Sequence, residues 1–106
     1  MAGTLLIVDD DDANCRLIKA IFSAEGMEVA AAHDGQSGID RARTHPPDVL
    51  LLDLRMPGLD GLEVLAKLKQ EVPALPVVML SGHRDVKAAV RATQLGAFDY
   101  ITKPFD

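Results

Sequence analysis

The strongest constraint on the fold is a set of four short apolar segments, each followed directly by a residue that can bind a metal ion or a phosphate. Residues 5–8 lead into Asp9 and Asp10, residues 49–52 into Asp53, residues 77–80 into Ser81, and residues 100–102 into Lys103. Strands that are apolar at successive positions are buried on both faces, as parallel strands covered by helices are. Ligands of open α/β sheets bind beyond the carboxyl ends of the strands, so we expect the chemistry at that edge.

Segments with helical periodicity separate the strands. We expect helices over residues 11–25, 35–44, 62–71 and 85–95, a weaker second strand over 28–32, and a fifth strand over 98–102. Strands that alternate with helices through right-handed crossovers form a doubly wound α/β sheet. The 106 residues fit one domain.

The composition limits the cellular compartments and binding partners that we expect for the protein. The formal net charge of −5 argues against nucleic-acid binding through a basic face of this domain. Cys15 is the only cysteine, which excludes an intrachain disulfide and favours a reducing compartment; we expect it to pack in a helix. The sequence has no signal peptide at its start and no apolar stretch long enough to span a membrane. We therefore expect a soluble, cytoplasmic protein.

The acidic residues at the expected sheet edge predict a cation site. Three carboxylates crowded there would repel one another, and a hard divalent cation bound by oxygen atoms would relieve that repulsion. Ser81 and Lys103 would then have an anion to bind. Four successive aspartates follow the first strand, more than helix capping can use, so we assign Asp9 and Asp10 to the metal and expect Asp11 or Asp12 to cap the helix.

Together, these motifs resemble the receiver domain of two-component response regulators. The matching segments are residues 8–11 (Val-Asp-Asp-Asp), 52–61 (Leu-Asp-Leu-Arg-Met-Pro-Gly-Leu-Asp-Gly), 80–82 (Leu-Ser-Gly) and 100–105 (Tyr-Ile-Thr-Lys-Pro-Phe). The resemblance implies a flavodoxin-like, five-stranded parallel sheet in the order 2-1-3-4-5. It also implies a phosphoacceptor domain that receives a phosphoryl group from the phosphohistidine of a histidine kinase, with Mg²⁺ bound.

The resemblance also assigns the chemistry of the expected site. Asp53 would accept the phosphoryl group, with Ser81 and Lys103 contacting it. Mg²⁺ would be held by Asp9, Asp10, Asp53 and the backbone carbonyl of Arg55. Such a domain catalyses its own phosphorylation and dephosphorylation and is not expected to turn over an external substrate.

A conformational switch is implied as well. Ser81 would move toward the phosphoryl group and Tyr100 would turn into the space that Ser81 leaves. The Lys103–Pro104 peptide bond is expected to be cis, by resemblance and because Lys103 must turn back toward Asp53.

Two other classes share some of these features. Haloacid-dehalogenase-like phosphatases form a phosphoaspartate with Mg²⁺, but they carry a second aspartate two residues after the nucleophile, where this chain has Arg55. A flavodoxin-like FMN binder needs a phosphate loop rich in Ser, Thr and Gly, whereas Asp9–Asp12 would repel the FMN phosphate. The phosphatase is the main alternative.

The expected partners follow from the resemblance. They are a sensor histidine kinase or a histidine phosphotransfer protein, and an output domain in the parent chain such as that of a transcription activator. The family's last helix is missing after Thr102, so residues 1–106 would be a receiver domain truncated before that helix. Apolar surface near Val8, Leu17 and Ile101 should then be open and favour self-association as a dimer.

Overall fold

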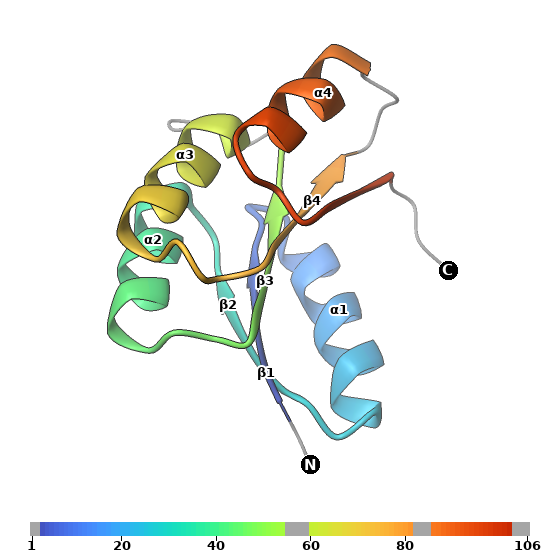
Figure 1. Ribbon diagram of the computed structural model, residues 1–106. Helices are drawn as coiled ribbons and strands as arrows, with labels where there is room; N and C mark the ends of the chain where they lie inside the picture. Colours follow the sequence, from blue (N-terminus) through green and yellow to red (C-terminus); the bar gives the residue numbers. More distant parts are fainter. Residues whose placement is uncertain (1–2, 55–59, 82–85, 103–106) are drawn as a thin grey trace.

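In a computed structural model of the protein, which describes residues 3–54, 60–81 and 86–102, five parallel strands form one sheet in the order β2-β1-β3-β4-β5 (Figure 1). The elements in chain order are β1 (Thr4–Val8), α1 (Asp12–Ala24), β2 (Glu28–Ala32), α2 (Gly35–Thr44), β3 (Val49–Asp53), α3 (Gly61–Glu71), β4 (Val77–Ser81), α4 (Val86–Gln94) and β5 (Asp99–Thr102). The expected sheet is confirmed, including its strand order and the weak second strand.

Helices cover both faces of the sheet, unequally. Figure 1 shows α1 on one face and α2, α3 and α4 on the other. Successive strand residues point to opposite faces, so Leu5 and Ile7 join Ile18 of α1 in one core cluster, while Leu6 packs with Leu65 of α3 in the other. Burial on both faces explains why β1, β3 and β4 are each apolar at four successive positions.

The surface predicted to be open is partly so. Leu17 of α1 is 44% exposed and Ile101 of β5 is 40% exposed, as expected. Ile101 pairs with Leu80, which belongs to the α1-side cluster, so Ile101 faces the α1 side of the sheet. The prediction for Val8 was wrong: Val8 is fully buried in the cluster under α2 and α3. Self-association through the exposed residues stays a prediction.

Aspartates cap the N-terminal ends of α1, α2 and α3. The side chains of Asp11, Asp34 and Asp60 accept hydrogen bonds from backbone N–H groups in the first turns of α1, α2 and α3. Such caps satisfy N–H groups that have no partner within the helix. After α1 the chain reverses at Gly26, whose φ of +86° is readily adopted by glycine. No helix in the described part of the chain is long and apolar enough to cross a membrane.

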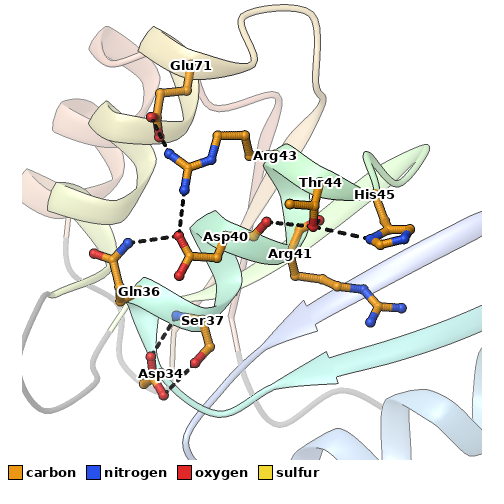
Figure 2. A network of polar contacts seen from close by, with 9 residues as sticks. All are labelled: Asp34, Gln36, Ser37, Asp40, Arg41, Arg43, Thr44, His45 and Glu71. Atoms are coloured by element: carbon orange, nitrogen blue, oxygen red, sulfur yellow. Dashed lines mark hydrogen bonds and ion pairs between the residues drawn. The ribbon is translucent and has the colours of Figure 1, made fainter.

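Polar contacts fix α2 at its start and against α3 (Figure 2). Arg43 donates to Glu71 of α3 at 3.0 Å and to Asp40 of α2 at 2.9 Å. At the start of α2, the backbone N–H and the hydroxyl of Ser37 both donate to Asp34. These two hydrogen bonds, the backbone one first, hold the pKa of Asp34 below its ordinary value. The capping carboxylate is therefore ionised at neutral pH.

Candidate functional site

The sheet order brings two aspartates together at its carboxyl edge. β1 lies beside β3, with Val8 paired to Leu52. Asp9 and Asp53 are the next residues along the two strands, so they lie side by side at the carboxyl edge. The Asp9 backbone N–H donates to Ala32 at 3.0 Å, which extends the β1–β2 pairing by one residue. Asp9 is fully buried and Asp53 is 6% exposed. Both aspartates are thus buried at the ends of neighbouring paired strands.

Asp9, Asp10 and Asp53 form a cluster of carboxylates. Each can offer one oxygen, and these three oxygens all lie within 4.8 Å of one another, with Asp9 and Asp53 buried and Asp10 exposed. Mg²⁺ binds through one or two carboxylates and keeps several waters, so two carboxylates of buried residues beside one of an exposed residue fit its preferences. The three residues predicted from the sequence as acidic ligands are therefore brought together.

The first turn of α1 closes over Asp9. One carboxylate oxygen of Asp9 accepts from the Asp11 backbone N–H at 2.9 Å, and the other accepts from the Asn14 side-chain amide at 3.3 Å. The thiol of Cys15, which is buried as expected, donates to the Asp9 carbonyl at 3.4 Å. A helix cap in this turn was predicted from the sequence, whereas the contact made by Asn14 was not. Its only sequence signal is its place one turn into the helix that follows the acidic run.

Ser81 lies on β4, the strand next to β3, and Tyr100 lies on β5, the strand beyond it. Ser81 is the last residue of β4 and is 1% exposed. Tyr100 of β5 pairs with Met79 and packs, partly buried, against the cluster under α2, α3 and α4. Its hydroxyl oxygen is buried and has no hydrogen-bond partner among the described residues. In the structure this hydroxyl therefore already points into the protein.

The other predicted site residues lie outside the described residues. These are Lys103 with the Lys103–Pro104 peptide bond, and Arg55, whose carbonyl was expected to bind the metal. Of the histidines that can be placed, His33 contacts Asp12 at 3.3 Å and His45 contacts Thr44 at 3.2 Å, both on the surface. Neither belongs to the carboxylate cluster.

A family comparison agrees with this geometry. Residues 5–106 match the model of the response regulator receiver domain. This chain belongs to that family. The match selects the receiver domain over the haloacid-dehalogenase-like phosphatase, which the comparisons do not support.

Curated relatives and solved structures agree with the family match. The chain is 44% identical over 104 residues to the DNA-binding transcriptional regulator NtrC of Klebsiella pneumoniae, covering 98% of this chain and 22% of NtrC. NtrX from Brucella abortus superposes with a TM-score of 0.93 at 41% identity, covering all of this chain and 25% of that one. A CheY-like receiver domain protein from Methanospirillum hungatei gives a TM-score of 0.95 at 30% identity, covering all of this chain and 85% of that one. The receiver domain thus spans about a fifth of the NtrC relative.

Asp10→Ala should weaken Mg²⁺ binding without unfolding the receiver domain. The substitution removes an exposed member of a repelling carboxylate cluster, so the metal-free domain should be as stable as the wild type or more stable. Mg²⁺ at about 100 times its Kd stabilises a protein by about 2.7 kcal/mol, and the variant should lose most of that gain at the same concentration. Urea unfolding with EDTA and with Mg²⁺ measures both quantities. An unfolded variant in EDTA would show that Asp10 is structural.

Proposed function

We propose that this receiver domain accepts a phosphoryl group on the carboxylate of Asp53, with Mg²⁺ held by Asp9, Asp10 and Asp53. The observation that carries the proposal is the convergence of these three carboxylates, within 4.8 Å, at the edge where ligands of such sheets bind. The family supports it, because phosphorylation and Mg²⁺ binding are known features of receiver domains.

For phosphoryl transfer, the protein mainly has to position the reacting atoms and stabilise the charge on the phosphoryl oxygens. An oxygen of Asp53 attacks the phosphorus atom in line with the P–N bond of a phosphohistidine; the P–O bond forms as the P–N bond breaks. Mg²⁺, when bound, would neutralise charge on the phosphoryl oxygens. The Ser81 hydroxyl can donate one hydrogen bond to the phosphoryl group, and by family resemblance Lys103 would pair with it and the Arg55 carbonyl would complete the metal site.

The proposed partner is a histidine kinase or a histidine phosphotransfer protein. The relative NtrC is named a DNA-binding transcriptional regulator, and this chain spans 22% of its length. We therefore propose that the receiver domain controls an output domain of a longer parent chain, such as a transcription activator. The net charge of −5 supports placing any DNA contact in that output domain.

A phosphorylation assay with two kinds of donor tests the function. The protein is incubated with acetyl phosphate, with or without Mg²⁺, and separately with a phosphomonoester such as p-nitrophenyl phosphate. With acetyl phosphate, intact-mass spectrometry should show one added phosphoryl group only when Mg²⁺ is present. With p-nitrophenyl phosphate, there should be no sustained release of nitrophenol. Steady hydrolysis of the monoester would contradict the proposal, and so would labelling that survives chelation.

Tyr100 should report the switch between two states of the domain. A beryllofluoride adduct on Asp53 should increase the population in which Ser81 has moved toward the adduct and Tyr100 is turned inward. Moving such an equilibrium from 1:99 to 99:1 takes roughly 5.5 kcal/mol of differential affinity, which a charged adduct meeting Ser81, Lys103 and Mg²⁺ can supply. Tyr100 ring resonances measured by NMR with and without the adduct should therefore differ.

The buried hydroxyl of Tyr100 provides a second readout. A buried polar group without a partner costs about 1–3 kcal/mol, so Tyr100→Phe should leave the domain as stable as the wild type or more stable. Tyr100→Phe should still switch, because it keeps the ring that fills the space beside Ser81. Identical Tyr100 resonances with and without the adduct would show that Tyr100 is not the switch residue.

A further inference from the structure

We propose that Asn14 is a positioning residue for the metal site: its side-chain amide holds the carboxylate of Asp9 in the orientation that Mg²⁺ binding requires. The proposal deepens the proposed function and rests on its assignment of Asp9 as a ligand. The supporting contact is the hydrogen bond from Asn14 Nδ2 to Asp9 Oδ2 at 3.3 Å.

The two Asp9 oxygens are held from opposite ends of one turn of α1. Oδ1 accepts from the Asp11 N–H at 2.9 Å and Oδ2 accepts from Asn14. The Cys15 thiol, on the next residue, contacts the Asp9 carbonyl at 3.4 Å. Asp9 is fully buried, so its carboxylate can rotate only by giving up these contacts. The start of α1 thus contacts both the backbone carbonyl and the side-chain carboxylate of Asp9 and restricts the orientation of that carboxylate.

Helix propensity does not explain an asparagine at this position. Asparagine is a weaker helix former than alanine, leucine or glutamine within a helix. Asn14 is partly buried and its side-chain amide donates to Asp9. The exposed Asp12 and Arg16, by contrast, form an ion pair with each other on the surface. The side chain at position 14 is therefore matched to the carboxylate beneath it.

The charge of the site favours a neutral donor at position 14. Asp9, Asp10 and Asp53 repel one another before a cation binds, and this concentrated negative charge is what attracts the cation. A lysine or arginine at position 14 would pair with Asp9 and oppose a metal cation. An amide orients the ligand without adding positive charge. Partners of this outer-shell kind typically change metal affinity 10–100-fold when they are removed.

The test compares two variants that lose the amide with a matched amide control. Asn14→Leu keeps the branched shape of the side chain, and Asn14→Ala removes the same donor without a large side chain. The control Gln36→Leu removes an exposed amide that donates to Asp40 on α2 at 3.1 Å, and neither residue belongs to the carboxylate cluster. Mg²⁺ titrations followed by amide NMR should give a Kd about tenfold higher for both Asn14 variants and an unchanged Kd for Gln36→Leu.

A double-mutant cycle assigns the effect to the Asn14–Asp9 contact. In an Asp9→Asn background, Asn14→Leu should change the Mg²⁺ Kd by less than about twofold, because non-additivity marks residues in direct contact. A readout without metal is the Asp11 amide proton, which donates to the same carboxylate. Its exchange with solvent should be faster in Asn14→Leu than in the wild type or in Gln36→Leu.

Failure of the Asn14 role can be distinguished from failure of the proposed metal site. If the wild type binds Mg²⁺ and Asp10→Ala weakens that binding, but Asn14→Leu and Asn14→Ala do not, the positioning role is wrong and the metal site stands. The positioning role would also be wrong if Asn14→Leu weakened Mg²⁺ binding equally in the wild-type and Asp9→Asn backgrounds. If Asp10→Ala and Asp53→Asn leave Mg²⁺ binding unchanged, the proposed metal site itself fails, and the role of Asn14 fails with it.

Discussion

Asp53→Asn is expected to abolish phosphoryl incorporation while the receiver domain stays folded. The substitution replaces the carboxylate nucleophile by an amide of nearly the same shape at a position that is 6% exposed, so packing should be preserved. It also removes one of three mutually repelling carboxylates, so unfolding in EDTA should need as much denaturant as for the wild type, or more. Mass spectrometry after acetyl phosphate and Mg²⁺ should show one added phosphoryl group on the wild type and none on the variant.

Asp60→Asn is the matched control for that experiment. Asp60 caps α3 by accepting from the Glu63 N–H at 3.0 Å, and asparagine caps helices about as well as aspartate. This variant should be phosphorylated like the wild type. A phosphoryl group on another carboxylate of the wild type would show that Asp53 is not the sole acceptor. Undiminished labelling of Asp53→Asn would remove Asp53 from the mechanism.

The fold and the acidic part of the site could be predicted from the sequence because both depend on backbone regularities. Each apolar segment ends in a polar residue, and parallel strands end at the same edge of a sheet. Asp9 and Asp53 therefore had to meet once β1 and β3 were neighbours, and the register confirms that they are. The Lys103 and Arg55 assignments lie outside the described residues and stay predictions.

The orientation of individual strand residues was harder to predict. A strand that is apolar at every position carries no alternation to show which residue faces which layer, and Val8 was wrongly expected beside open surface. The structure shows the reason in α2, where a Cβ on Gly38 would lie 2.7 Å from a Val8 methyl carbon. The small residue lets α2 approach β1 closely, so Val8 is covered by α2.

Asn14 illustrates a different limit. Its role depends on one side-chain hydrogen bond to Asp9, and a polar residue in the first turn of a helix usually meets only solvent. Neither spacing nor composition distinguishes Asn14 from its exposed neighbours. The hydrogen bond becomes visible only when the turn that follows β1 is placed above the buried carboxylate.

Gly61→Ala should cause a large loss of stability, because α3 begins against the end of β3. The Gly61 N–H donates to the Leu54 carbonyl at 2.8 Å. A Cβ at this position would lie 2.6 Å from the Asp53 carbonyl oxygen and 2.6 Å from the Leu54 Cα. Both atoms are backbone and cannot rotate away, so either the helix or the strand end must move. Overpacking typically costs 1–3 kcal/mol, and we expect about 3 kcal/mol here.

That loss should appear as a fall in Tm of roughly 12–24 °C, at 4–8 °C for each kcal/mol in a domain of about this size. The contrasting variant is Gly26→Ala, where a Cβ would contact nothing within 4 Å and only the φ of +86° opposes the side chain. Gly26→Ala should cost about 1–2 kcal/mol and leave phosphorylation of the folded protein unchanged. In Gly61→Ala, displacement of the Asp53 backbone should also slow phosphorylation under conditions where the variant is folded. Equal stabilities for the two variants would show that the close approach of α3 to β3 does not constrain the site.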